Sequence, residues 1–170
     1  MSTSSPASRI QANLTELFEG NITPGDPYIK FQLTREVTAL LSMKQVKESS
    51  IVEAGKITPL PNMPTSTIGM MNSRDRVFCI FDLSQLLGFP VQQITPRQYQ
   101  IIVLQTIEEP AIQIGFAVMN LQGIIRLTSE QIQPTTKIDS LNSHLAPFVS
   151  GVVARMNLPI LQLEEILAAL

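Results

Sequence analysis

Apolar and polar residues alternate along short segments of this chain, and this period of two constrains its fold more than any other feature. Residues 28–34 read YIKFQLT, and residues 37–43 read VTALLSM. Successive side chains of a β-strand point to opposite faces of the sheet, so each segment predicts a strand with one buried face. Arg35 and Glu36 stand between the two segments. They predict the turn of a hairpin.

The rest of the chain favours further short strands over long helices. The segments with strand-like composition are residues 77–81, 101–107, 112–118 and 123–127. Three prolines between Lys56 and Thr65 predict an irregular or edge-like segment there, because proline cannot donate to a β-ladder. Few segments are long enough for crossover helices. We therefore expect antiparallel sheets curled into barrels, not a parallel α/β sheet.

Leucine-rich stripes at helical spacing predict two short helices. The first follows Asp82, which makes a capping pair with Gln85 three residues later. The second helix ends the chain. The apolar stripes, which we expect to face the core, are Leu83, Leu86 and Leu87 in the first helix and Leu163, Ile166, Leu167 and Leu170 in the second.

Two passages that end in these helices resemble each other. GMMNSRDRVFCIFDLSQLLG begins at Gly69, and GVVARMNLPILQLEEILAAL begins at Gly151. Each runs from its glycine through a strand, a turn and a second strand into the helix. The second turn is expected to be two residues shorter, and Gln162 stands in the place of Asp82. The echo predicts one domain built of two similar sub-barrels, in which Gly69, Gly151 and Asp82 are structural positions.

The N-terminal region differs from the remainder in composition. Residues 1–9 are rich in Ser, Thr and Pro, which predicts disorder. Residues 10–18 carry apolar residues at helical spacing, and a linker with two prolines follows over residues 21–27. The predicted helix either packs on its own domain or docks on a partner. We therefore divide the chain into a tail, residues 1–27, and one domain, residues 28–170.

Reactive side chains are scarce. His144 is the only histidine, and Cys79, the only cysteine, lies in an apolar run that predicts a small core residue. We expect no catalytic residues, no metal site and no cofactor, because neither an acid–base constellation nor a glycine-rich phosphate loop is present. The protein is therefore predicted not to be an enzyme.

Charge and hydropathy exclude further classes of function. The 12 basic and 14 acidic residues are scattered, so the electrostatic footprint of a nucleic-acid binder is missing. Neither a secretory signal nor an apolar run of membrane-spanning length is present, and we expect a cytoplasmic protein that does not insert into membranes. Charged residues make up only 15% of the chain, against roughly 25% in typical soluble domains. A surface with so few charged residues favours interfaces with partner proteins.

Three strings resemble a known family, the CheW-like domains. They are PYIKFQLTREVTALLSMKQVKES, GKITPLPNMPTSTIGMMNSRDRVFCIFDLSQLLG and QIGFAVMNLQGIIRLTSEQIQP. The resemblance covers residues 28–170. It implies an all-β fold of two intertwined five-stranded SH3-like barrels with short helices, including a C-terminal one. It also implies a non-catalytic adaptor between a chemoreceptor cytoplasmic tip and the regulatory domain of a CheA-like histidine kinase, acting in chemotaxis, phototaxis or type IV pilus motility.

The resemblance also implies roles for individual residues. Val46 and Glu48 match the family's Val-x-Glu element near the receptor groove, and Arg74 matches the arginine of an Asn-x-Arg-Gly turn at the receptor-binding face. Asn72 matches the motif asparagine, with a structural role in the turn. Asp75 replaces the motif glycine, so the turn is expected to differ. Plain alternatives remain: a solvated arginine at 74 and a core valine at 46.

Two other functions remain open from the sequence. One is a small SH3-like barrel that binds nucleic acid, against which the scattered charges argue. The other is a stand-alone regulatory domain of a kinase, which shares the implied fold.

Overall fold

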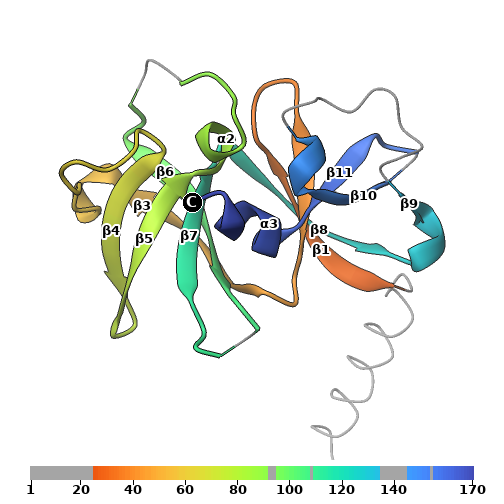
Figure 1. Cartoon of the computed structure of the whole chain (residues 1–170), viewed down its shortest axis with the longest axis horizontal. Coiled ribbons are helices and arrows are strands. Elements are labelled where there is room, and N and C mark those ends of the chain that lie inside the picture. Colours follow the sequence, from red (N-terminus) through yellow and green to blue (C-terminus); the bar gives the residue numbers. More distant parts are fainter. Residues whose placement is uncertain (1–24, 92–94, 108, 135–144, 154) are drawn as a thin grey trace, which may run out of the picture.

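The computed structural model describes residues 25–91, 95–107, 109–134, 145–153 and 155–170. The predicted helix at residues 10–18, most of the predicted tail and His144 lie outside them. The described chain forms two curled β-sheets side by side, with short helices at the junction between them (Figure 1). No helix in this part of the chain is long and apolar enough to cross a membrane.

Sheet A contains six strands in the order β8-β1-β2-β11-β10-β9. Their bounds are β1 (Asp26–Gln32), β2 (Thr38–Ser42), β8 (Asn120–Leu127), β9 (Ile132–Gln133), β10 (Val149–Val153) and β11 (Leu158–Leu161). Sheet B contains five strands in the order β3-β6-β7-β5-β4. Their bounds are β3 (Val46–Glu53), β4 (Thr67–Ser73), β5 (Arg76–Asp82), β6 (Gln98–Gln105) and β7 (Gln113–Val118).

Strand pairs are antiparallel except β2–β11 and β5–β7. The helical elements are α2 (Leu83–Leu86), α3 (Leu163–Ala168) and the short 3-10 turns η1 (Ala54–Lys56), η2 (Ser129–Gln131) and η4 (Ala146–Phe148). The two curled sheets are the two SH3-like barrels of the predicted all-β fold, and this prediction is confirmed.

Sheet A combines strands from both ends of the described chain. Sheet A takes its first two strands from the start of the described chain and its other four from the end, whereas sheet B is built from β3 to β7 in between. The barrels are therefore intertwined. Sheet A has six strands, not five, because the two-residue β9 pairs with β10; the counterpart in sheet B is a single bridge between Thr58 and Met70.

Register extends the internal duplication over the whole domain. In β3, Lys47 is left unpaired opposite β6, where Val46 pairs with Leu104 and Glu48 with Val103. In β8, Gln122 is left unpaired in the same way opposite β1. A 3-10 turn follows each of these strands. The first half of the domain, which contains β3 to β5, and the second half, which contains β8 to β11, thus share their bulges as well as their order of elements.

The two echo passages also match in register. Gly69 lies opposite Ile80 and Gly151 opposite Ile160, each next to a β-bulge in its hairpin. The predicted difference in turn length was wrong. Two residues join β4 to β5, whereas four residues join β10 to β11. Strands β10 and β11 are shorter than β4 and β5. Spacing along the sequence counts strand and turn together, so it could not separate the two.

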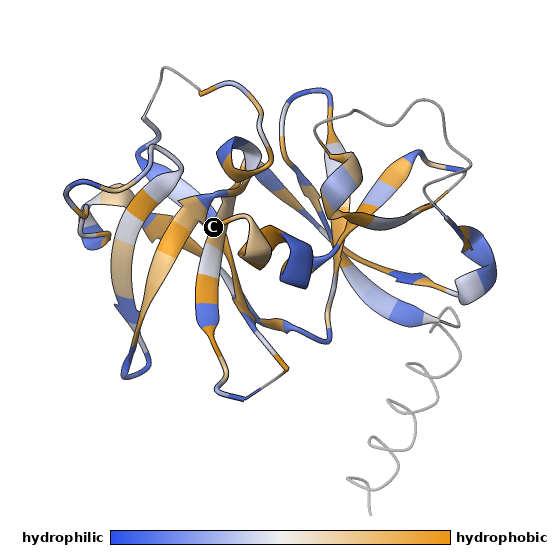
Figure 2. Ribbon diagram, viewed as in Figure 1, coloured by the Kyte–Doolittle hydropathy of each residue, from blue (hydrophilic) through white to orange (hydrophobic). Residues whose placement is uncertain are grey.

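Within the described ranges, buried apolar side chains form three clusters. The largest, here called the inter-sheet core, takes residues from both sheets, whereas each of the other two takes residues from one sheet only and fills its barrel. Strand β6 shows the arrangement: Ile102 and Leu104 face the inter-sheet core, while Ile101 and Val103 face the interior of barrel B. Such strands are buried on both faces, and Figure 2 shows apolar residues throughout the middle of the molecule.

The helices cover the inter-sheet core. Leu83, Leu87, Leu163 and Ile166 are buried in it, as the stripes predicted. Leu170 is 54% exposed, contrary to the prediction, because α3 ends at Ala168 and no further turn holds it.

Several strand boundaries also differ from those predicted, and β6 and β8 each begin three residues earlier, at Gln98 and Asn120. Strand β6 ends at Gln105 and β7 begins at Gln113, so Ile107 and Ile112 lie exposed in the connection between them. Cys79 is half-buried and packs against the inter-sheet core, consistent with a small apolar residue.

Replacing Gly69 by alanine is expected to destabilise the protein by about 1–3 kcal/mol. A Cβ atom there would lie 2.3 Å from the backbone oxygen of Thr58, which is held in its bridge to Met70. Chemical denaturation measures the effect. Gly55→Ala is the matched control, because its Cβ would meet nothing within 4 Å. A loss of stability in Gly55→Ala equal to that in Gly69→Ala would contradict the steric explanation.

Candidate functional site

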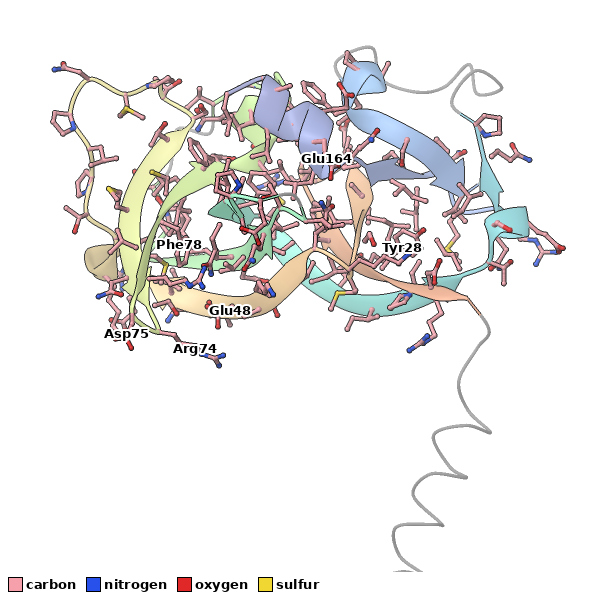
Figure 3. All side chains as sticks on the ribbon, turned by 60° about the horizontal axis from the view of Figure 1, so that its bottom comes forward. Tyr28, Glu48, Arg74, Asp75, Phe78 and Glu164 are labelled. Carbon is pink, nitrogen blue, oxygen red and sulfur yellow. The ribbon has the colours of Figure 1, made fainter. Side chains whose placement is uncertain are left out.

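The two halves of the domain differ most clearly at Glu48. Its counterpart in the second half is Gly123, which occupies the same place after the bulge. The Glu48 side chain is 24% exposed and reaches toward the tip of the β4–β5 hairpin (Figure 3). A carboxylate where the other half has no side chain marks this place as specialised.

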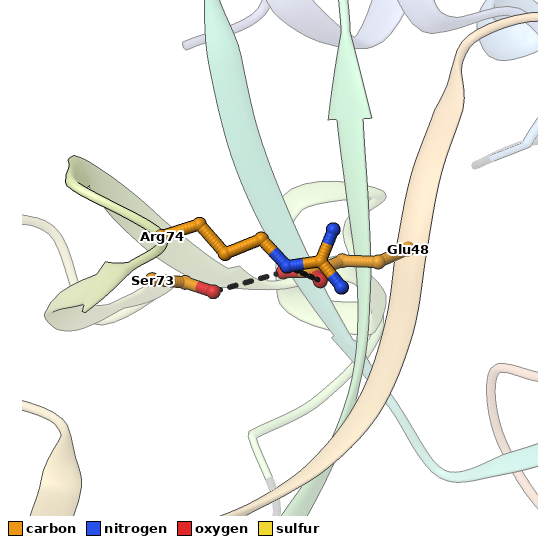
Figure 4. Close-up of polar contacts among 3 residues, drawn as sticks. All are labelled: Glu48, Ser73 and Arg74. Carbon is orange, nitrogen blue, oxygen red and sulfur yellow. Dashed lines mark hydrogen bonds and ion pairs between the residues drawn. The ribbon is translucent and has the colours of Figure 1, made fainter.

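Two neighbouring hairpin residues bind the Glu48 carboxylate. The Ser73 hydroxyl donates a hydrogen bond to Oε1 at 3.1 Å, and Arg74 Nε lies 3.8 Å from Oε2 (Figure 4). The Arg74 side chain remains 86% exposed. Glu48 therefore lies within ion-pair distance of the guanidinium without covering it, and the charged fork stays available at the surface.

The same contacts join the two edges of sheet B. Strands β3 and β4 lie at opposite ends of its strand order, so they do not share a ladder. Curling of the sheet brings Glu48 of β3 to Ser73 of β4, and the hydrogen bond between them links the edges. The ion pair of Arg74 thus lies where the barrel closes.

The hairpin tip has an unusual backbone. Arg74 and Asp75 have φ angles of 50° and 65°, the pair of left-handed residues that a type I′ turn requires. Glycine was expected at the second position, and its absence was expected to alter the turn. Asp75 nevertheless adopts the left-handed conformation, which aspartate tolerates better than most residues. The two-residue turn keeps Ser73 and Arg76 paired.

The bulge separates Val46 from Glu48. Two residues apart on a regular strand, they would share a face. With Lys47 unpaired, Val46 instead pairs with Leu104 and packs against the inter-sheet core, whereas Glu48 pairs with Val103 on the side of the barrel interior. The structure thus brings Glu48 and Arg74 together and places half-buried Val46 at the junction of the sheets.

Of the remaining predicted positions, Asp82 makes structural contacts. Asp82 caps α2: its Oδ1 accepts hydrogen bonds from the backbone N–H of Ser84 at 3.1 Å and from the Ser84 hydroxyl at 2.8 Å. Gln85 donates to Oδ2 at 3.0 Å, so the predicted pair exists, but between side chains. Gln162 makes no such cap for α3. Asn72 lies exposed in β4 opposite Val77.

The sequence pattern missed Ser73 and the joining of the two sheet edges. Ser73 lies inside the quoted motif, yet its role depends on a partner 25 residues away. Across the described ranges, no three His, Cys, Asp or Glu side chains are placed to hold a metal ion. The chemistry that the cluster offers is recognition: a guanidinium held in place can pair with a carboxylate across an interface.

Comparison with known proteins decides the family. The model of the CheW-like domain matches residues 27–170. This chain belongs to the CheW-like domain family. Its fold also resembles the crystal structure of the scaffolding protein TtCheW from Thermoanaerobacter tengcongensis, with a TM-score of 0.64 and 19% identity over 81% of this chain and 88% of that one.

Curated relatives of this CheW-like domain agree with the match. The chemotaxis protein CheW of Thermotoga maritima is 28% identical over 89 residues, 52% of this chain and 56% of the relative. The probable chemotaxis protein CheW of Rhizobium etli is 33% identical over 100 residues, 58% of this chain and 62% of the relative. Each match spans less than two thirds of the relative's length.

Replacing Asp75 by glycine is expected to stabilise this CheW-like domain by about 1 kcal/mol, because glycine adopts the left-handed conformation without strain. Urea denaturation measures the gain. Asp75→Ala is the control: alanine removes the same charge but keeps a Cβ atom, so it should bring no gain. Equal stabilisation by both substitutions would point to charge, not backbone strain, as the cause.

Proposed function

We propose that this chain is a non-catalytic scaffold that couples a chemoreceptor-type sensor to a CheA-like histidine kinase. Membership of the CheW-like family supports the proposal, as do the names of the relatives, which are chemotaxis proteins, and the description of the structural neighbour as a scaffolding protein. The observation that carries it is the exposed Arg74, held by Glu48 at the tip of a strained turn.

Arg74 is the direct contact in this proposal. Its guanidinium forms an ion pair with Glu48 at 3.8 Å and has exposed donors that can reach a carboxylate of the receptor tip. Glu48 acts through Arg74 by limiting its orientations before binding. A side chain that is already positioned loses less conformational entropy when it binds.

Val46 supplies the apolar part of the same surface. It lies half-buried beside the inter-sheet core, at the start of the strand that carries Glu48. The receptor tip is proposed to contact the junction of the sheets near Val46 and to pair with Arg74. The regulatory domain of the kinase then binds at the end of a barrel.

Coupling by such a scaffold depends on mechanical continuity. The inter-sheet core takes side chains from both sheets, and strands from both ends of the chain complete sheet A. A displacement at one barrel therefore moves the other as part of one body. A receptor signal passes to the kinase only if its two states bind the scaffold with different affinities.

The setting of this role is proposed to be cytoplasmic, in chemotaxis, phototaxis or type IV pilus motility. The nucleic-acid alternative gains no support: 12 basic residues are balanced by 14 acidic ones. A stand-alone kinase regulatory domain would share the fold, and the binding experiment below separates the two. A scaffold binds both a receptor tip and a kinase regulatory domain.

Replacing Arg74 by alanine is expected to weaken binding to a chemoreceptor tip fragment by about tenfold or more, the scale of an interface hot spot. Binding to a kinase regulatory domain should not change. Isothermal titration calorimetry with each partner measures both affinities. Glu48→Gln should weaken receptor binding less, because it removes only the group that positions the arginine.

Arg155→Ala is the matched control, since Arg155 is exposed in the equivalent connection of the second half. It should leave both affinities unchanged. Failure of the parent protein to bind a receptor tip and a kinase domain would refute the proposed scaffold. Equal losses in Arg74→Ala and Arg155→Ala would refute the specific role of Arg74.

A further inference from the structure

Gln45 lies buried in the turn that leads into β3. It is only 9% exposed, although glutamine residues are mostly found at protein surfaces. Its backbone carbonyl accepts a hydrogen bond from the Gln105 amide at 2.9 Å, which holds the turn against the end of β6. Val46, the first residue of β3, follows it directly. The placement of Gln45 therefore determines where β3 begins.

The side chain of Gln45 forms a hydrogen bond with the C-terminal helix. Its Nε2 donates to Oε1 of Glu164 at 2.7 Å, across 119 positions of the sequence. The direction of the bond is fixed, because a carboxylate can only accept and glutamine donates only from Nε2. A hydrogen bond to a carboxylate is also stronger than one between neutral groups. Glu164 therefore holds the amide of Gln45 beside α3.

This bond joins elements of the two sheets. Helix α3 follows β11 of sheet A and buries Leu163 and Ile166 in the inter-sheet core. Gln45 leads into β3 of sheet B, and Glu164 lies at the junction between the sheets (Figure 3). Apolar contact is non-directional, whereas a hydrogen bond requires a defined geometry. The bond thus fixes the first turn of α3 against the entrance to β3.

The equivalent helix of the first half makes a different contact. Counted from the start of each helix, Ser84 of α2 corresponds to Glu164 of α3. The Ser84 hydroxyl donates to Asp82, two residues away, at 2.8 Å, whereas Glu164 binds a residue of the other half. The repeated fold therefore does not require the long-range bond. It occurs beside the strand that carries Val46 and Glu48.

We propose that Glu164 and Gln45 are positioning residues for receptor binding. Their hydrogen bond keeps the start of β3 in place, and with it half-buried Val46 and, beyond the bulge at Lys47, Glu48. The inference rests on the proposed scaffold function, in which a receptor tip meets Val46 and the arginine paired with Glu48. Gln45 and Glu164 act through β3 and need not touch the receptor. A surface ordered before binding loses less conformational entropy when it binds.

Replacing Glu164 by alanine is expected to weaken binding to a chemoreceptor tip fragment by about threefold to tenfold, because the buried amide loses its acceptor and the start of β3 is no longer held. Binding to a kinase regulatory domain should not change. Isothermal titration calorimetry with each partner measures both affinities. Glu165→Ala is the matched control, since Glu165 is an exposed glutamate of the same helix, and it should leave both affinities unchanged.

Exchange of the two side chains separates the bond from the identity of the residues. Gln45→Glu places two carboxylates against each other and should weaken receptor binding at least as much as Glu164→Ala. Combining Gln45→Glu with Glu164→Gln restores one donor and one acceptor in the reverse order, and most of the affinity should return. A double variant that binds no better than Gln45→Glu alone would overturn the proposal.

Hydrogen exchange of the full chain tests the positioning without a partner. The Gln105 amide, which donates to the Gln45 carbonyl, should exchange about fivefold faster or more in Glu164→Ala. The Asp82 amide, which donates to the Ser66 carbonyl at 2.7 Å, should not change. Equal acceleration at both amides would indicate a general loss of stability and contradict the positioning role, as would an unchanged Gln105 amide.

The binding data also separate this inference from the scaffold function. If the parent protein binds no receptor tip, the scaffold function fails and the receptor role of Glu164 fails with it. If the parent binds and folded Glu164→Ala binds equally well, only the positioning role is refuted.

Discussion

The fold depends on the inter-sheet core. Each sheet has an apolar face that its own barrel does not cover, and the two faces bury each other. The central strands are therefore apolar on both sides: in β6 four consecutive residues, Ile101–Leu104, divide between two clusters. A sheet separated from its partner would expose its share of this core to water, a cost of roughly 25 cal/mol per Å² of apolar surface. Neither barrel is a plausible independent unit.

Internal duplication supplies a built-in reference for function. Both halves need the bulge, the 3-10 turn and the hairpin with its glycine, so these shared features belong to the fold. The halves differ at three equivalent places. The first half carries Glu48 where the second carries Gly123, and Asp82 where the second carries Gln162. Its hairpin turn also has two residues, against four in the second half. The first and the last of these differences coincide with Arg74, which pairs with Glu48 and lies in the two-residue turn. The packing of the repeated fold does not require Glu48, because the second half has glycine at the equivalent position, so we assign this residue to recognition.

Local pattern predicted the elements but not their long-range pairing. Alternation gave the strands, leucine spacing gave the helices, and the echo gave the duplication. The building of sheet A from both ends of the chain could not be predicted from the residues alone, because β1 pairs with β8, whose residues lie 88 to 101 positions later, and no local signal encodes that choice. The Glu48–Ser73 contact was missed for the same reason. Arg74 was found only because its motif resembles that of a family.

This topology also determines which sheet can form first while the chain is being synthesised. Sheet B is continuous from β3 to β7, so all its strands are synthesised before β8 is made. Strands β1 and β2 are made first, yet four of the six strands of sheet A are made last. Until then, the first hairpin can rest only on the newly formed face of sheet B. A chain that ends before β8 therefore leaves β1 and β2 without the other four strands of sheet A, and the apolar surface left exposed favours aggregation.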